Sequence, residues 1–292
     1  MAANEAEGLI QPALKDDALL GDIRAGGSDD AFRLWWLGQS GFLLQWRGRH
    51  ALLDPYLSDS LTRKYAGTAT PHVRMTARPI DPTRLDFVDV VRASHAHTDH
   101  MDPDTLRPML RAKPRLPLIV PAAAREVAAE RLGVPASSLI GLDDGASVEV
   151  GGFRFTAVAS AHETLECDAV GRSRYLGYVV QFGPWSIYHS GDTLLYDGLA
   201  EKLRPFAVDV ALLPINGRAP ERRVAGNLDG REAAWLGRQM GARLVIPCHY
   251  EMFRFNTADP LEFAAAARAD GQPFEIVRCG ERWEYPRARR TS

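Results

Sequence analysis

One short histidine-rich segment narrows the folds and functions open to this chain, Ser94-His-Ala-His-Thr-Asp-His100. It follows a predicted strand over residues 86–94 and supplies four potential metal ligands, His95, His97, Asp99 and His100. On a helix the first two would lie about 200° apart, whereas in a loop after a strand they can converge on one ion. Imidazole with carboxylate and without thiolate suits Zn, Fe or Mn. We therefore predict a metal site here.

The composition is that of an ordinary globular protein. Of 292 residues, 46% are hydrophobic and 25% charged, which argues against a disordered, collagen-like or coiled-coil chain. The formal net charge of −2 suggests neither a nucleic-acid scaffold nor a polybasic membrane binder. The three cysteines lack Cys-x-x-Cys spacing, the N-terminus is acidic, and no apolar run approaches the roughly 18 residues of a membrane span. We expect a soluble cytoplasmic protein without a nucleic-acid or membrane partner.

The order of patterns along the chain indicates mixed strands and helices in one domain. Residues 1–30 are polar, end in a breaker sequence and are predicted to form an N-terminal arm, and residues 31–292 are predicted to form a single domain. Asp229 and Glu232 have capping-box spacing at the start of a predicted helix, and two closing strands are expected over 274–278 and 283–285. The stretch 55–82 is either a lid over a site or a solvated surface loop.

The histidine-rich segment resembles the His-x-His-x-Asp-His motif of the metallo-β-lactamase superfamily. His162 in Ala161-His-Glu163, Asp192 in Ser190-Gly-Asp192 and His249 in Cys248-His-Tyr250 match the remaining motifs in chain order. The resemblance spans residues 32–285. It implies an α/β fold of the metallo-β-lactamase type, a four-layer αββα sandwich of mixed β-sheets with helices on both outer faces.

The resemblance also implies a site for two divalent metal ions, Zn or Mn, with Fe open as well. It assigns one ion to His95, His97 and His162 and the second to Asp99, His100 and His249, with Asp192 bridging both. Two cations about 3.5 to 4 Å apart can share a hydroxide and polarise a substrate oxygen, which is hydrolase chemistry. Asp99 and Asp192 are the predicted catalytic carboxylates.

His189 stands three positions before the bridging Asp192 and has two readings. It either orients a ligand through a hydrogen bond or is a core histidine.

Several segments resemble the ascorbate-6-phosphate lactonase group of the superfamily, notably Trp35-Trp-Leu-Gly-Gln-Ser-Gly41 and Tyr188-His-Ser-Gly-Asp192. A weaker likeness to the N-acyl-phosphatidylethanolamine phospholipase D group lies at Gly183-Pro-Trp185. We therefore expect a metal-bound hydroxide to open a small lactone or cleave an ester of an anionic substrate, with or without a phosphate group. A phosphodiesterase or a nuclease of the same fold is the alternative.

Basic residues near the expected site suggest how an anion could be bound. Arg is well suited to bidentate recognition of phosphate or carboxylate. The candidate substrate-binding residues are Arg74, Arg218, Arg222 and Arg223, and with Arg63, Lys64 and Arg78 they would form a positive mouth. The alternative is that these are solubilising surface charges. The family analogy is also compatible with a homo-oligomer.

Overall fold

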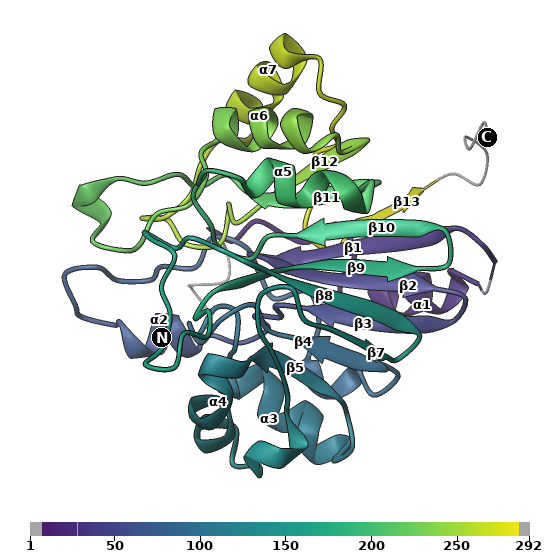
Figure 1. The fold of residues 1–292 in the computed structure, drawn as a ribbon. Helices are drawn as coiled ribbons and strands as arrows, with labels where there is room; N and C mark the ends of the chain where they lie inside the picture. Colours follow the sequence, from purple (N-terminus) through teal and green to yellow (C-terminus); the bar gives the residue numbers. More distant parts are fainter. Residues whose placement is uncertain (1–7, 28, 286–292) are drawn as a thin grey trace.

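The computed structural model describes residues 8–27 and 29–285. Two sheets lie face to face at its centre, with helices outside each of them (Figure 1). The first sheet has seven strands in the order β13 (Arg282–Tyr285), β1 (Phe32–Gly38), β2 (Gly41–Trp46), β3 (Arg49–Leu53), β4 (Val90–Arg92), β5 (Leu118–Pro121) and β6 (Ile140–Leu142). The second has six in the order β12 (Leu244–Cys248), β11 (Val210–Pro214), β10 (Trp185–His189), β9 (Leu176–Phe182), β8 (Phe153–Ala159) and β7 (Ser147–Val150).

Each sheet carries its own layer of helices. The outer layer of the first sheet contains α1 (Asp16–Ala25), α3 (Pro103–Ala112) and α4 (Arg125–Leu132). The second sheet is covered by α5 (Leu199–Leu203), α6 (Gly230–Met240) and α7 (Pro260–Asp270). Both sheets contain parallel and antiparallel pairs. The αββα sandwich with mixed sheets and helices on both outer faces is therefore confirmed.

Strand β1 shows why the sequence reads as nearly continuous apolar runs. All seven of its residues are buried. Leu34 and Trp36 belong to the core between the sheets, whereas Trp35 and Leu37 belong to the core beneath the outer helices. Because side chains alternate between the two faces of a strand, a strand covered on both faces is apolar at successive positions.

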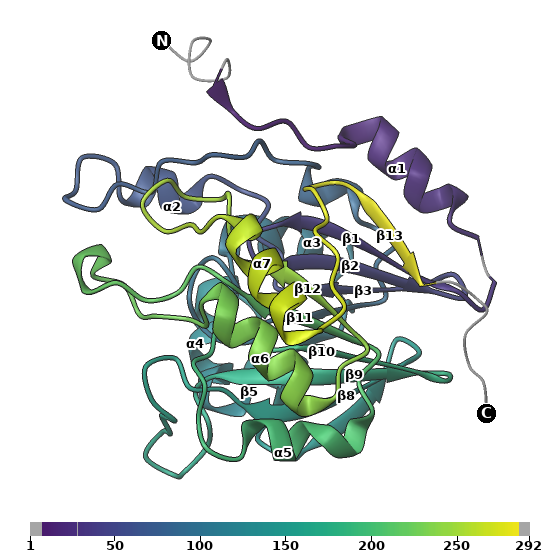
Figure 2. The ribbon, with the colours of Figure 1, turned by 90° about the horizontal axis from the view of Figure 1, so that it is seen from above.

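Part of the predicted N-terminal arm packs on the first sheet. Leu19, Leu20 and Ile23 of α1 are at most 3% exposed and share a core with β1, β2 and β3. The Trp35 indole donates a hydrogen bond to Asp22 at 2.8 Å. Figure 2 shows α1 running alongside the edge of the fold that carries β1 and β13. Residues 1–7 of the predicted arm lie outside the described residues.

Two local predictions have different outcomes. The capping box is confirmed, because the Asp229 carboxylate accepts from the Glu232 amide at 2.8 Å and the Glu232 carboxylate accepts from the Asp229 amide at 3.0 Å. The predicted strand over 274–278 is wrong, since Phe274 forms only an isolated bridge to Val245. The final strand β13 pairs with β1 at the edge of the first sheet.

The stretch 55–82 contains a short helix, α2 (Ser60–Lys64), and is tied to the segment after β12. The Met75 amide donates to the Met252 carbonyl at 2.8 Å, and the Arg254 amide donates to the Val73 carbonyl at 3.0 Å. The stretch is thus not a fully solvated loop, because backbone hydrogen bonds join it to the segment after β12. Among the described residues, no helix combines the length and apolarity needed to cross a membrane.

Candidate metal centre

The seven predicted ligands come together from four loops, each of which follows a strand. The loops after β4, β8, β10 and β12 supply, in that order, His95, His97, Asp99 and His100, then His162, then Asp192, then His249. Their ligand atoms form three overlapping groups, and within each group these atoms lie within 4.8 Å of one another. The structure therefore brings all seven residues together, although they are up to 154 positions apart in the chain.

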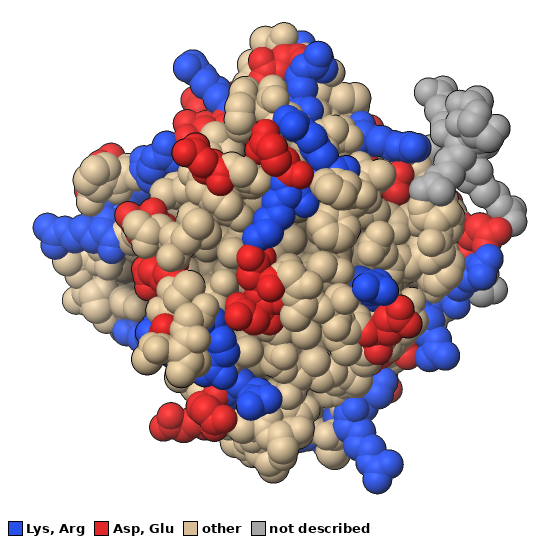
Figure 3. Space-filling model, in the orientation of Figure 1, with Lys and Arg blue, Asp and Glu red and all other residues tan. Residues whose placement is uncertain are grey.

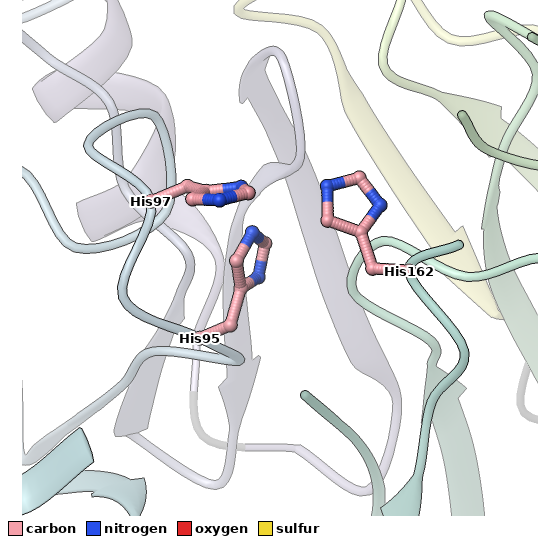
Figure 4. A group of neighbouring side chains, drawn as sticks. All are labelled: His95, His97 and His162. Atoms are coloured by element: carbon pink, nitrogen blue, oxygen red, sulfur yellow. The ribbon is translucent and has the colours of Figure 1, made fainter. Parts of the chain in front are cut away.

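The first group consists of three imidazoles that face one another, from His95, His97 and His162 (Figure 4). The ring centroids of His95 and His97 are 4.6 Å apart, and those of His97 and His162 are 5.1 Å apart. The Gly226 carbonyl lies 3.0 Å from His162 Nδ1 and accepts a hydrogen bond from it, so the neutral ring has its proton on Nδ1 and a lone pair on Nε2. Three neutral imidazoles are a common ligand set for a divalent metal ion.

The second group contains Asp99, His100 and His249, and Asp192 lies between the two groups. Asp192 Oδ1 is 3.1 Å from His100 Nε2, and its Oδ2 is 3.3 Å from His249 Nε2. The same Oδ2 is 3.7 Å from His162 Nε2 of the first group. One carboxylate thus reaches imidazoles of both groups, as a bridging ligand must.

The donor set fits metal ions. Buried polar atoms normally have a hydrogen-bond partner. Within the described residues, His95 Nε2, His100 Nε2 and Asp192 Oδ1 are buried and have no hydrogen bond. All three belong to the cluster, where cations would satisfy them.

Burial and charge act in opposite directions on the titration of this cluster. Burial lowers the pKa of His95 and His97, so both imidazoles are neutral and can donate lone pairs. Burial alone would raise the pKa of Asp192, but His100 and His249 outweigh it and keep that pKa well below its usual range. In turn, burial would lower the pKa of His249, but Asp192 and Asp99 raise it to about 9. A metal ion there would displace protons from the second group.

Asp54 supports the centre and was missed in the sequence. It is fully buried at the end of β3, and its carboxylate lies 2.7 Å from His100 Nδ1. It also accepts from the Arg92 guanidinium and the Ser94 amide, each at 2.7 Å. By fixing the Nδ1 side of His100 it aims Nε2 at the cluster. The signal available was its position directly after a buried strand.

Gln39 was also missed as a site residue. It lies in the turn between β1 and β2, and its Nε2 donates to Asp99 Oδ2 at 2.8 Å. The backbone carbonyl of Gln39 accepts a hydrogen bond from the His249 backbone amide at 2.9 Å. This turn therefore holds a carboxylate and an imidazole of the second group in place.

His189 is buried and supports loops rather than a ligand side chain. Its Nε2 is 2.8 Å from the Ser40 carbonyl, and the Gly191 amide donates to its Nδ1 at 3.2 Å. It thereby connects the β1–β2 turn to the backbone beside Asp192. Burial lowers its pKa to about 3, which keeps it neutral.

A cavity of about 380 Å³ opens above the cluster. Its floor includes His97, Asp99, His162, Asp192 and His249. Three aromatic side chains line it, Tyr65 and His72 from the stretch 55–82 and Phe253 from the segment after β12. Glu163, Glu166 and Tyr175 line it as well. Lys64 and Arg131 are its lining cations.

None of the four arginines predicted to contact substrate lines this cavity. Arg74 is buried and donates to Asp59 and to the Ser58 and Thr76 carbonyls. Arg218 pairs with Glu232, and Arg222 donates to the Asn216 carbonyl. Arg223 is exposed outside the cavity.

The other basic residues named for a positive mouth also lie mostly away from this cavity. Arg63 pairs with Asp104 and Arg78 with Asp81, so of the basic residues named for it only Lys64 lines the cavity. On the face shown in Figure 3, basic and acidic side chains are interspersed. The charge pattern of the sequence identified cations but not the carboxylates that pair with them.

The αββα sandwich with a histidine and aspartate cluster at its strand ends defines a metal-dependent hydrolase of the metallo-β-lactamase fold. Residues 49–250 match the model of the beta-lactamase superfamily domain. A metal-dependent hydrolase of the UPF0173 family from Opitutus terrae is 31% identical over 254 residues, covering 85% of this chain and 98% of that protein. A UPF0173 family hydrolase from Methanosarcina mazei is 28% identical, and the alignment covers 81% of this chain and 91% of that protein. The chain belongs to the beta-lactamase superfamily as a metal-dependent hydrolase of the UPF0173 family.

Solved structures support the fold. Igni18, a metallo hydrolase from Ignicoccus hospitalis, superposes with a TM-score of 0.65 at 22% identity, covering 88% of this chain and 100% of that one. A possible metal-dependent hydrolase from Veillonella parvula gives a TM-score of 0.68 at 16% identity, covering 86% and 98%.

Proposed function

We propose that this chain hydrolyses a small lactone or ester, with two divalent metal ions held by the seven clustered residues. Zn and Mn suit the donor set, and Fe is compatible with it. The observation that supports the proposal is the convergence of five imidazoles and two carboxylates, three of whose buried atoms have no hydrogen bond within the described residues.

Two such ions, when bound, supply a nucleophilic water at neutral pH and polarise the oxygen of the substrate. The residues of the chain provide geometry and proton handling. Asp192 spans the two groups of imidazoles. The Asp99 side chain is 18% exposed at the cavity floor, and Gln39 fixes its Oδ2. Asp99 is therefore placed to accept a hydrogen bond from the attacking water or to pass a proton to the leaving alcohol.

The cavity favours a small substrate with one anionic group over a polyanion. A volume of about 380 Å³ suits a small molecule. Lys64 and Arg131 can neutralise one anionic group, whereas Glu163 and Glu166 would repel a chain of phosphates. This balance supports a lactone or simple ester, and it disfavours the nuclease alternative.

The test combines metal analysis with a substrate screen. The metal content per chain is measured by mass spectrometry on protein purified without chelator, and lactones, phosphomonoesters and phosphodiesters are then compared by kcat/KM. We expect two metal ions per chain and a higher kcat/KM for lactones or carboxylic esters than for the other substrates. His97→Ala should lower both the metal content and kcat/KM. Less than one metal ion per chain, or equal turnover by His97→Ala, would refute the proposal.

A further inference from the structure

Tyr175 is held rigidly beside the metal centre. It precedes β9, and its carbonyl accepts from the Ser160 amide at 3.0 Å. The next amide, of Leu176, donates to the Ser94 carbonyl at 3.1 Å. These two bonds tie Tyr175 to the end of β8 and to the start of the histidine-rich loop. Its backbone position is therefore set by the same elements that position the ligands.

The Tyr175 ring touches every imidazole of the first ligand group. Its centroid is 5.3 Å from that of His95, 5.9 Å from that of His97 and 5.2 Å from that of His162. The side chain also lines the cavity above the centre. A substrate that reaches the first group must therefore pass within reach of this residue.

The Tyr175 hydroxyl is free to bind a ligand. It makes no hydrogen bond within the described residues and is not among their buried unpaired atoms, so it is accessible on a side chain that lines the cavity. Two other tyrosines of the fold use their hydroxyls internally. That of Tyr196 donates to the Ala159 carbonyl at 2.6 Å, and that of Tyr250 donates to the Val277 carbonyl at 3.4 Å.

We propose that the Tyr175 hydroxyl donates a hydrogen bond to the substrate oxygen that gains negative charge during hydrolysis. This inference rests on the proposed hydrolase function and adds a substrate-contacting residue to it. Water adds to the carbonyl carbon, the alcohol oxygen leaves with a proton, and Tyr175 keeps its own proton throughout. A fixed neutral donor stabilises the transition state more than the ground state, because its partner is most negative there.

A purely structural reading assigns Tyr175 only to packing against the three imidazoles. Tyr175→Phe separates the two readings, since phenylalanine keeps the ring contacts and removes only the hydroxyl. Tyr196→Phe is a matched control, because it also removes one phenol hydroxyl from a residue outside this cavity.

We expect Tyr175→Phe to lower kcat about 10²-fold, as removal of one oxyanion donor does. KM should change by less than about threefold, because the interaction is strongest in the transition state. The metal content per chain should equal that of the wild type. Tyr196→Phe should keep kcat within about twofold. A kcat for Tyr175→Phe within twofold of wild type would overturn the proposal.

A binding measurement decides the case in which the wild type turns over no substrate. Inorganic phosphate is titrated calorimetrically into the metal-loaded wild type and into metal-loaded Tyr175→Phe. We expect about tenfold weaker binding by the variant, the typical cost of one hydrogen bond to a charged acceptor. Equal affinities, or no binding of phosphate to the wild type, would overturn the role of Tyr175. Missing turnover alone would count against the proposed function instead.

Discussion

The two ligand groups are supported by different chemistry, although they share Asp192. The first group, His95, His97 and His162, has three imidazoles, and a backbone carbonyl supports His162. The second group contains the Asp99 carboxylate and is supported by Asp54 and Gln39. Burial lowers the pKa of His95 and His97, whereas carboxylates override burial and raise the pKa of His100 and His249. His95 and His97 of the first group are thus held neutral by burial, whereas the imidazoles of the second group are paired with carboxylates.

The largest effect should come from removing the shared carboxylate, because both ligand groups then lose a metal ligand. Asp192→Ala leaves both groups without their common ligand, and the raised pKa of His100 and His249 then loses its leading electrostatic cause. We expect the metal content to fall for both ions and kcat/KM to fall roughly 10³-fold or more. Metal analysis after gel filtration and the kinetic screen measure this. Retention of one tightly held ion would show that Asp192 serves only one group.

The next largest effect should come from removing one imidazole of each group in a matched pair of variants. His162→Ala and His249→Ala each delete a buried ligand from a different loop. We expect each to lose about one ion per chain, because the affected group keeps only two ligands of its own beside the shared Asp192. Chelator competition should show the remaining ion held more tightly in His162→Ala, where the second group keeps its carboxylate. The reverse order would contradict the contrast drawn between the groups.

A smaller effect, confined to one group, should come from changing Asp54, which supports a ligand of the second group without being a ligand itself. Asp54→Asn weakens the acceptor of His100 Nδ1 and leaves the buried Arg92 without its carboxylate. Loss of a residue that orients a metal ligand typically lowers metal affinity 10- to 100-fold, and we expect this for the ion of the second group. Chelator competition monitored ion by ion checks it, with the first-group ion as internal control. Equal weakening of both ions would mean that Asp54 acts on the fold as a whole.

The sequence predicted the ligands better than their surroundings, for a physical reason. The histidine-rich loop, His162, Asp192 and His249 each follow an apolar run, so residue type and position together indicate a strand-end cluster. Arg218 shows the opposite case, since its partner Glu232 was assigned only to the capping box, although it also forms that ion pair. Long-range ion pairs depend on which loops meet, and local sequence does not encode that.

The smallest effect should come from Ser94, whose hydroxyl links the two groups. Its Oγ donates to Asp54 Oδ2 at 2.5 Å, because a carboxylate can only accept. Ser94 Oγ, which lies 3.0 Å from His95 Nδ1, therefore accepts a hydrogen bond from that nitrogen, and the lone pair of His95 is on the unpaired Nε2. Ser94→Ala removes one hydrogen bond from each group's support, about 1 kcal/mol each. We expect both ions to be held about fivefold less tightly in chelator competition, with little change in kcat. A loss confined to one ion would show that the hydroxyl supports one group alone.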